Sequence, residues 1–539
     1  NWLSEFPPRK TKIGMLSAVA KEGIRPIAFR HERGAVMAAD GFSRVMNRQG
    51  FGVVAVQSQA GAENSLGGIA QAFADNIPIL VFLGGNSLNQ LSVKPNFNAV
   101  QRYQGWVKHI EAIYHPNQVG DVMRRAFHAL RNGAPGPVVI ELISDVCNQN
   151  ISEKAQNYTS PRLTKQMPEP LEIEATADAL LASKTPMIWA GAGVLFSGSS
   201  DALKELSQLT SIPVFCTMPG KSGFDERDPL SLGSGCGTTP QMAHEWLKYS
   251  DVILALGSSL TRSPYAQAIP KGKILIQNTN NPDDINKDEP IQINLVGDTK
   301  LTIENLIRVI KKKTQNKGFG DLEKTASKIK VIKESWLAKW HDSLHSDEEP
   351  ISYYRVIQEI NKNLDLENSI VTHDAGAPRD TIVPFFSATI PHSYIGWGKT
   401  THLGFGIPLM IGAKMAQPEK FCLNLMGDGA FGMSGTDIET AVRSGAAITT
   451  VLLNNSAMAT YSGPLQGTIG EEARNRYGVS SMQGDYAKIA EGMGAIGIKV
   501  SKPDDIGSAL KEAQVQNKKG KTVLIEVEAN IEQRRSKFQ

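Results

Sequence analysis

The chain has 539 residues, 41% of them apolar, and its 57 Lys and Arg nearly balance its 54 Asp and Glu, for a formal net charge of +3. This length predicts about three to four domains, each large enough for a sizeable core. The balanced charge excludes the basic composition of nucleic-acid or anionic-membrane binders. The longest apolar stretch, residues 77–83, is too short to cross a bilayer. We therefore expect neither nucleic acid nor a membrane as a partner.

Cysteine spacing and the start of the chain predict the compartment. The four cysteines, Cys147, Cys216, Cys236 and Cys422, have neither metal-binding nor disulfide spacing, which is typical of a reduced cytoplasm. No secretory leader is visible before the first expected strand at residues 2–6. We therefore expect a cytoplasmic protein.

Strands and helices alternate along the chain, which predicts an α/β fold with parallel sheets. Three doubly wound domains are expected, at residues 1–146, 171–312 and 350–530. Polar segments at residues 147–170 and 311–350 separate them. Further apolar strands are expected at residues 26–29, 52–56, 136–143, 186–190, 251–256, 447–453 and 521–527.

Polar side chains follow the strands of the first domain. Glu32 comes after strand 26–29 and opens a helix, where the macrodipole alone would favour a carboxylate. Gln57 and Gln59 follow strand 52–56, and their amides can orient a carbonyl group but cannot titrate. Both are candidates to face a substrate, and either could instead satisfy loop backbone groups.

Two histidines are the acid–base candidates, because an imidazole titrates near neutral pH. His31 immediately precedes Glu32, and His402 lies in a glycine-rich segment of the third domain. A lone histidine also commonly has a structural role, so both interpretations remain open.

Oxygen ligands end two strands of the third domain. Asp428 lies in the turn Gly427-Asp428-Gly429, and Asn455 ends strand 447–453 after an expected helix at residues 435–444. The carboxyl ends of parallel strands form the ligand-binding edge of such sheets. Mg²⁺ prefers carboxylate and amide oxygens, and glycine lets the backbone approach a phosphate closely. Together the two segments predict a Mg²⁺–diphosphate site, although either alone would also suit an ordinary turn.

Three segments carry a resemblance to thiamin diphosphate (ThDP) enzymes. Gly-Asp-Gly at residues 427–429 followed by Asn-Asn at 454–455 resembles the family's metal signature. Residues 30–44 resemble its Arg-His-Glu-x-Gly-Ala block, and residues 396–408 resemble the segment that grips the cofactor's pyrimidine ring. The resemblance spans nearly the whole chain and is nearest to the acetolactate synthase-like branch. It implies that the first domain binds the cofactor's pyrimidine ring, the second is the central domain and the third binds the diphosphate.

The resemblance also implies roles for individual residues. Glu32 would be the catalytic glutamate that protonates the aminopyrimidine, and Leu403 would wedge between the two cofactor rings. The Thr401 carbonyl would accept a hydrogen bond from the cofactor's 4′-nitrogen. Asp428, Asn455 and the main-chain carbonyl of Ala457 would hold Mg²⁺. Further cofactor contacts are expected at Gly61, Asn64, Gly376, Ala377, Gly427, Gly429, Ala430 and Met458.

The reaction implied is the formation or cleavage of a carbon–carbon bond next to the carbonyl of a 2-oxo acid. The synthases of this branch carry FAD in the central domain, but residues 257–262 depart from the expected flavin contacts. The glycine turn at residues 191–193 could still seat a nucleotide, so FAD remains an open alternative. The segment 456–464 also lacks the synthases' tryptophan-bearing stretch.

Two other functions remain as alternatives. The chain could be a 2-hydroxyacyl-CoA lyase or oxalyl-CoA-type decarboxylase, with the basic run at residues 534–537 meeting the phosphates of an acyl-CoA, although a solvated charged tail would explain that run too. It could also be a non-catalytic relative that serves as a binding or regulatory subunit. By family analogy we expect a homodimer or homotetramer, with Glu32 and the metal motif meeting across two subunits.

Overall fold

The computed structural model describes residues 14–147, 149–152, 155, 158–458 and 470–538, so the expected strand at 2–6 lies outside the described residues. The chain divides into two compact units. The first comprises residues 1–164, 400–418 and 434–446. The second comprises residues 165–399, 419–433 and 447–539.

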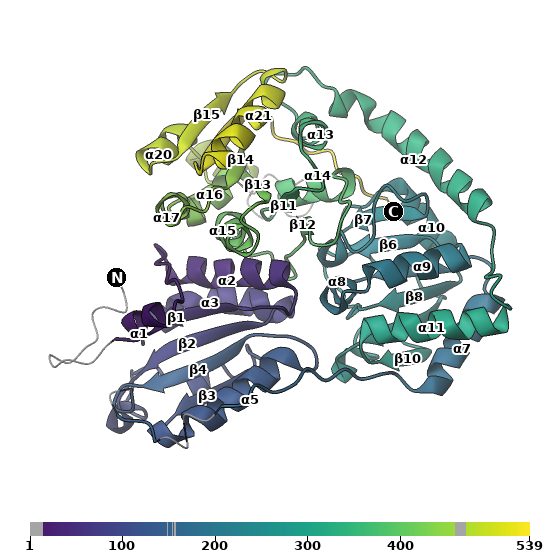
Figure 1. Cartoon of the computed structure of the whole chain (residues 1–539). Coiled ribbons are helices and arrows are strands. Elements are labelled where there is room, and N and C mark those ends of the chain that lie inside the picture. Colours follow the sequence, from purple (N-terminus) through teal and green to yellow (C-terminus); the bar gives the residue numbers. More distant parts are fainter. Residues whose placement is uncertain (1–13, 148, 153–154, 156–157, 459–469, 539) are drawn as a thin grey trace. The chain divides into compact units, whose positions relative to one another are not determined.

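The first unit is built on a four-stranded parallel sheet with the order β1-β2-β4-β3. Helix α5 packs its apolar stripe on one face of this sheet, and α2 and α3 lie on the other face (Figure 1). The elements are β1 Gly52–Val56, β2 Ile79–Gly85, β3 His109–Ile113, β4 Val138–Ile143, α1 Met15–Lys21, α2 Glu32–Met46, α3 Ala60–Ala74, α4 Ala99–Arg102, α5 Val119–Arg131, α15 Gly406–Ala416 and α17 Asp437–Ser444.

Glycines bring α2 and α15 into backbone contact. A Cβ added to Gly412 would lie 1.8 Å from the Ala38 carbonyl oxygen, and one added to Gly41 would lie 2.1 Å from that of Leu409. Such distances leave no room for a side chain, so the small residues of α2 serve close helix packing. This packing places α15 in the first unit, although it follows the second unit's central strands in sequence.

The expected strand at residues 26–29 is wrong. These residues form no strand and pair with none in the part of the chain that the structure describes. Side chains satisfy this backbone instead: Arg443 Nη2 donates to the Ala28 carbonyl at 2.7 Å, and the Arg30 amide donates to Asp437 at 3.4 Å. Pro26 has no N–H to give to a ladder.

A buried polar network ties α2 and α3 to the start of the 400–404 segment. Arg44 bridges Asp40 at 2.5 Å and Asp75 at 2.9 Å. Gln71 donates to Asp75 at 2.9 Å and accepts from the Thr400 hydroxyl at 2.6 Å. These bonds pair the polar side chains that α2 and α3 bury here.

The second unit contains two six-stranded parallel sheets, with orders β10-β9-β8-β5-β6-β7 and β12-β11-β13-β14-β16-β15. The strands are β5 Met187–Ala190, β6 Val214–Thr217, β7 Ser231–Gly235, β8 Val252–Leu256, β9 Ile274–Thr279, β10 Ile293–Val296, β11 Ser369–His373, β12 Tyr394–Ile395, β13 Phe421–Gly427, β14 Thr449–Asn454, β15 Ile496–Val500 and β16 Val523–Glu528. The helices are α7 Pro170–Ala182, α8 Ala192–Ser197, α9 Ser200–Thr210, α10 Gln241–Tyr249, α11 Thr299–Lys313, α12 Leu322–Leu344, α13 Tyr353–Asn363, α14 Ala377–Phe385, α16 Asp428–Ser434, α19 Glu471–Tyr477, α20 Tyr486–Gly492 and α21 Asp505–Lys518. The predicted class, α/β with three parallel sheets, is confirmed, as are the remaining expected strands to within two residues.

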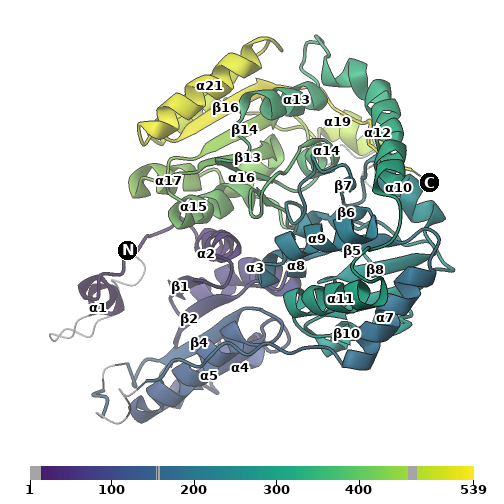
Figure 2. The same cartoon turned by 45° about the vertical axis from the view of Figure 1, so that its right-hand side comes forward.

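Much of the basic segment at residues 311–350 is helix rather than linker. Helix α12 (Figure 2) begins after Asp321, whose side chain accepts from the Lys324 amide at 3.0 Å. Its buried residues include Trp336 and Trp340, which lie among the aromatic side chains of α13 and α14. A buried apolar stripe at helical spacing therefore anchors a helix whose other faces carry many charged residues.

Part of the C-terminal basic run packs against α12, while Arg534 and Lys537 remain exposed. Ser536 is buried and accepts from the indole N–H of Trp336 at 3.2 Å. The Arg534 guanidinium lies 3.9 Å from the Trp340 ring centroid and donates to the Lys339 carbonyl. Arg535 donates to the carbonyls of Glu532 and Arg534. These contacts use both guanidinium groups of the run within the chain. Among the described residues, no helix is both long enough and apolar enough to span a membrane.

Candidate active site

Glu32 begins α2, and its carboxylate is largely enclosed, with 11% of the side chain exposed. Asn64 of α3 donates its Nδ2 to Glu32 Oε2 at 3.1 Å. A Cβ added to Gly61 would lie 3.5 Å from the other carboxylate oxygen. The structure thus brings together Glu32, Gly61 and Asn64, three of the predicted residues, and leaves one carboxylate oxygen beside a glycine surface.

His31 caps the helix that carries Glu32. Its Nδ1 accepts from the Arg33 amide at 3.1 Å and lies 4.0 Å from Glu32 Oε2. Capping of this kind satisfies one of the unpaired N–H groups of the first helical turn. With Nδ1 occupied as an acceptor, only Nε2 is available for proton exchange, and half of the side chain is exposed.

Gln57 and Gln59 differ in their surroundings. The Gln57 side chain lies against Gly61, where an added Cβ would be 2.6 Å from its Cγ. Gln59 instead joins loops: its Nε2 donates to Asn86 at 3.1 Å and to Asn96 at 3.3 Å, while its Oε1 accepts from a backbone amide at 2.9 Å. These bonds hold Gln59 at φ +58°, a conformation rare for a residue with a side chain. Of the two glutamines, Gln57 is therefore the one that lies near Glu32, since both side chains adjoin Gly61.

The segment that carries Thr401, His402 and Leu403 belongs to the same unit as Glu32. Thr401 has φ +53°, which is strained for a β-branched residue and turns the chain sharply before Gly404. The His402 ring lies over α3, because a Cβ added to Gly67 would be 2.5 Å from its Nε2. Leu403 is partly buried. Backbone strain of this kind is maintained only where surrounding contacts fix it, as the Thr400–Gln71 bond does here.

His402 is a neutral imidazole at neutral pH. Burial lowers its pKa below the usual value, and the nearby positive charge of Arg33 lowers it further. The Leu403 carbonyl acts in the opposite direction. A neutral ring of this kind can accept a proton but cannot serve as a standing acid.

Asp437 of α17 lies against the start of α2. It is 2% exposed and accepts from the Arg30 amide and the Thr440 hydroxyl, and a Cβ added to Gly34 would lie 2.3 Å from it. Burial raises the pKa of this carboxyl to about 6. The sequence offered no signal for this contact, which supports the helix that presents Glu32.

The raised pKa predicts a pH dependence of stability. Relative to the ordinary value of 3.8, a folded-state pKa of about 6 means that the native state holds the proton more tightly. Its contribution to stability is therefore complete below the unfolded pKa and is lost as pH rises through about 6. Asp437→Asn should raise the free energy of unfolding at pH 7.5 by roughly 1–3 kcal/mol and flatten its slope between about pH 4 and 6, as measured by urea denaturation. Asp201→Asn, at an exposed site in α9, is the control; an unchanged slope in Asp437→Asn would contradict the prediction.

The second unit holds the predicted metal ligands. Asp428 follows β13, and its Oδ1 accepts from the Gly429 amide at 2.7 Å. Its Oδ2 is buried without a hydrogen-bond partner in the described ranges. Burial raises the pKa of this carboxyl, while the N–H groups of Gly429, Ala457 and Ser456 partly lower it. A buried carboxylate oxygen without a partner is costly unless a cation binds it.

Asn455 lies beyond the end of the neighbouring strand β14, with its side-chain amide held at both ends. The Ala457 amide donates to Asn455 Oδ1 at 3.0 Å, and Asn455 Nδ2 donates to the Tyr353 hydroxyl at 2.9 Å. Because Ala457 also lowers the pKa of Asp428, the structure brings together the three predicted ligand residues. An oxygen-rich set of this composition fits Mg²⁺.

Glycines and a helix start lie beside the predicted metal ligands in the second unit. Gly376 has φ +85° and precedes α14, whose first residue is Ala377. A Cβ added to Gly427 would lie 3.9 Å from Pro378 of that turn, and one added to Gly429 would lie 3.0 Å from Met458 Cγ. The N–H groups of a helix start favour an anion, so this turn suits a diphosphate. Ala430 is buried in α16.

The glycines of the central sheet have a structural explanation. A Cβ added to Gly191 would lie 2.4 Å from the Gly257 carbonyl oxygen, and one added to Gly193 would lie 2.5 Å from its Cα. Close packing between the turns after β5 and β8 therefore explains these glycines, and a bound nucleotide is not needed to explain them.

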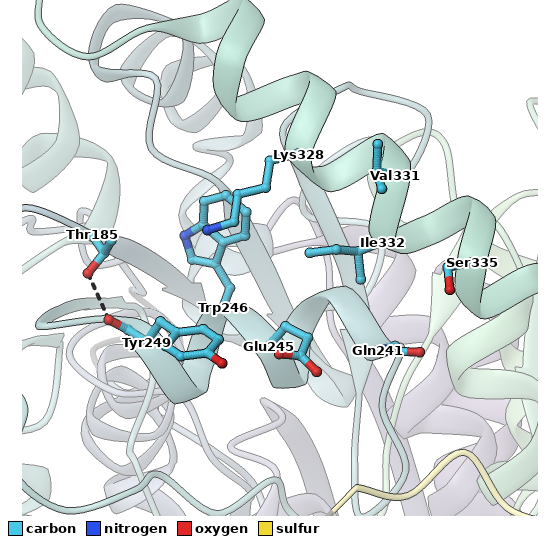
Figure 3. A pocket seen from close by; sticks show the side chains of 9 residues that line it. All are labelled: Thr185, Gln241, Glu245, Trp246, Tyr249, Lys328, Val331, Ile332 and Ser335. Carbon is cyan, nitrogen blue, oxygen red and sulfur yellow. Dashed lines mark hydrogen bonds between the residues drawn. The ribbon is translucent and has the colours of Figure 1, made fainter.

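A cavity of about 250 Å³ lies between α10 and α12 in the second unit (Figure 3). The Lys328 ammonium lies over the Trp246 ring at 4.7 Å, and the Thr185 hydroxyl donates to the Tyr249 carbonyl. None of the predicted site residues lines this cavity.

Sequence reasoning missed Tyr353 and Asp437. Tyr353 contacts a predicted ligand from a position about 100 residues earlier in the chain, in an unremarkable Ile-Ser-Tyr-Tyr stretch. Asp437 looks like an ordinary acidic residue at a helix start. Neither residue type nor spacing distinguishes these two positions, because both roles arise from contacts distant in sequence.

Three family models match the chain in order. They are the N-terminal TPP binding domain of thiamine pyrophosphate enzymes over residues 8–111, the central domain over residues 173–306, and the C-terminal TPP binding domain over residues 374–527. A probable acetolactate synthase large subunit of Methanocaldococcus jannaschii is 29% identical, over 91% of this chain and 83% of the relative. The acetolactate synthase isozyme 3 large subunit of Escherichia coli K12 is 27% identical, over 94% and 88%.

A solved structure agrees on the fold. Benzoylformate decarboxylase from Polynucleobacter necessarius superposes with a TM-score of 0.78 at 19% identity, covering 94% of this chain and 92% of that one. The three family models together cover residues from each of the three parallel sheets. The chain belongs to the thiamine pyrophosphate enzyme family.

Proposed function

We propose that this chain is a Mg²⁺-dependent, acetolactate synthase-like ThDP enzyme that forms or cleaves a carbon–carbon bond next to the carbonyl of a 2-oxo acid. The observation that carries the proposal is the environment of two carboxylates, Asp428 and Glu32. Asp428 keeps one buried oxygen without a partner in the described residues, and Glu32 is enclosed and oriented by Asn64. The family resemblance supports the proposal, because it implies a catalytic role for Glu32 and a metal-binding role for Asp428.

One set of residues binds the metal and the diphosphate, and another set transfers protons. Asp428, Asn455 and the Ala457 carbonyl hold Mg²⁺, and the turn at Gly376 and Ala377 receives the diphosphate. Glu32 exchanges a proton with the aminopyrimidine, and Asn64 keeps its carboxylate in place. When bound, the cofactor supplies the electron sink for carbanion chemistry.

The segment 401–403 orients the cofactor ring. The Thr401 carbonyl and the Leu403 side chain fix the ring's position, so that the reacting groups are held close together, an effect that can contribute about 7–11 kcal/mol. His402, neutral at neutral pH, and Gln57, beside Gly61, face the substrate, and His31 Nε2 is a further proton carrier. Among these residues, only the two histidines and Glu32 can move a proton.

The proposal predicts products that separate the alternatives. The reconstituted protein with ThDP and Mg²⁺ is assayed with pyruvate and other 2-oxo acids, and CO₂ and acetolactate are followed by mass spectrometry. Acetolactate supports a synthase, and CO₂ with an aldehyde supports a decarboxylase. Turnover only of acyl-CoA thioesters would favour a 2-hydroxyacyl-CoA lyase or oxalyl-CoA-type enzyme. ThDP binding without any turnover would favour a binding or regulatory subunit.

We further propose a homodimer or homotetramer in which Glu32 of one copy serves the cofactor held by Asp428 of another, in keeping with the family resemblance. Mixing two inactive variants tests this arrangement. If sites are shared, Glu32→Gln and Asp428→Ala proteins that exchange subunits regain part of the wild-type activity. No recovery after demonstrated subunit exchange would place both residues of each site in one chain.

A further inference from the structure

We propose that Tyr353 is a positioning residue of the metal site, whose hydroxyl holds the Asn455 side-chain amide so that its oxygen stays available to the cation. The inference rests on the proposed Mg²⁺ and ThDP binding, and it concerns a residue that no motif of the family resemblance includes. It starts from the Asn455 Nδ2 to Tyr353 Oη hydrogen bond of 2.9 Å.

An asparagine ligand needs such a device because its two ends differ. The oxygen can bind Mg²⁺, whereas the NH₂ group is only a donor and would repel the cation. A rotation about the last side-chain bond exchanges these ends. At Asn455 the Ala457 amide, which can only donate, faces Oδ1 at 3.0 Å and thereby selects the productive end.

Tyr353 acts on the opposite end of the same amide. Its oxygen accepts from Nδ2, so the amide plane is fixed between two partners rather than pivoting about one. The tyrosine itself cannot move away: it is 2% exposed and begins α13, where the Ser352 side chain caps the helix by accepting from the Tyr354 amide. Burial raises the pKa of Tyr353, and the negative charge of Asp428 raises it further, so the phenol lies near both side-chain ligands.

The adjacent residue, Tyr354, provides a matched control. It is equally buried, but its ring packs against Trp340 and Phe385, and its hydroxyl donates to the Arg534 carbonyl at 2.6 Å. Tyr353→Phe and Tyr354→Phe therefore each remove one hydroxyl and one buried hydrogen bond from the same helical turn. Only the first of these changes reaches a metal ligand.

The experiment measures Mg²⁺ affinity by isothermal titration of the full-length protein at saturating ThDP. Tyr353→Phe is expected to raise the Mg²⁺ Kd by about 10–100-fold, the usual effect of losing a partner of a metal ligand. Excess Mg²⁺ should restore kcat, because the reacting groups are untouched. Tyr354→Phe should leave the Mg²⁺ Kd within twofold of wild type. It should lower Tm by about as much as Tyr353→Phe does, because each variant loses one buried hydrogen bond.

An Asn455→Asp background supplies a second test, because both ends of a carboxylate are oxygens and a rotation costs no ligand. There Tyr353→Phe should change the Mg²⁺ Kd by less than threefold, so that the two substitutions are strongly non-additive. A Mg²⁺ Kd for Tyr353→Phe within twofold of wild type, or an equal loss in Tyr354→Phe, would overturn the role of Tyr353. A wild-type protein that binds no Mg²⁺ and no ThDP would overturn the proposed function instead, together with this role.

Discussion

Glu32→Gln should lower kcat by about 10²–10⁴-fold while ThDP affinity stays within a few fold of wild type. The substitution keeps the side chain's shape, and Asn64 can still donate to an amide oxygen at this position. What it removes is the exchangeable proton of the carboxyl group. Steady-state kinetics with the product assay, together with ThDP titration, separate the two effects.

The matched control is Glu63→Gln. Glu63 lies in the first turn of α3 and is exposed, so it tests whether loss of any nearby acidic charge slows the reaction. We expect its kcat to stay near wild type. Wild-type rates in Glu32→Gln would exclude this residue as the catalytic glutamate, whatever the outcome for Glu63.

The second large effect is expected from Asp428→Ala, which should weaken Mg²⁺ binding by more than about 100-fold, beyond the effect of losing a ligand's partner. ThDP affinity should fall with it, because the cation neutralises the diphosphate. Isothermal titration of Mg²⁺ and ThDP measures both losses. Asp505→Ala, at an exposed position in the first turn of α21, is the control.

The same variant should not destabilise the protein without its cofactor. Burial raises the pKa of Asp428, so its charged form costs stability above that pKa, and alanine removes this cost. The Tm of cofactor-free Asp428→Ala should therefore equal or exceed that of wild type. Addition of Mg²⁺ and ThDP should raise only the wild-type Tm, since only a state that binds the ligand is stabilised by it. A large fall in the Tm of the cofactor-free variant would mean that Asp428 is a structural residue.

Strand ends were the most predictable part of this molecule. Asp428 and Asn455 each adjoin the carboxyl end of a short apolar run, β13 or β14, and parallel pairing then places the two neighbouring ends at one edge of the sheet. Glu32 was predictable as a helix start, where His31 caps the first turn. In these cases local sequence and sheet topology determine the position together.

Contacts between distant segments were not predictable. The 26–29 segment has a strand-like composition, but Arg443 and Asp437 satisfy its backbone from far along the chain. Gln59 looked able to face a substrate, yet its amide joins loops. The sequence around Tyr353 is typical of a core tyrosine and does not indicate its hydrogen bond with Asn455. Each outcome depends on tertiary contacts between segments that are distant in sequence, and residue spacing does not determine such contacts.

Backbone conformation was also outside the reach of the motifs. Thr401 has φ +53°, and nothing in the sequence of residues 396–408 indicated this conformation. A β-branched residue in this region costs about 1–3 kcal/mol unless its surroundings hold it. The neighbouring Thr400 hydroxyl, bonded to Gln71, belongs to the contacts that hold it.

The most direct test of the central claim, that this chain activates ThDP through Glu32, needs no knowledge of the substrate. Exchange of the cofactor's thiazolium C2 proton for deuterium is measured by quenched-flow NMR on the Mg²⁺-loaded protein. We predict exchange much faster than in free ThDP for wild type, and a return toward the free rate in Glu32→Gln. Exchange in the bound wild-type protein no faster than in solution would contradict the claim.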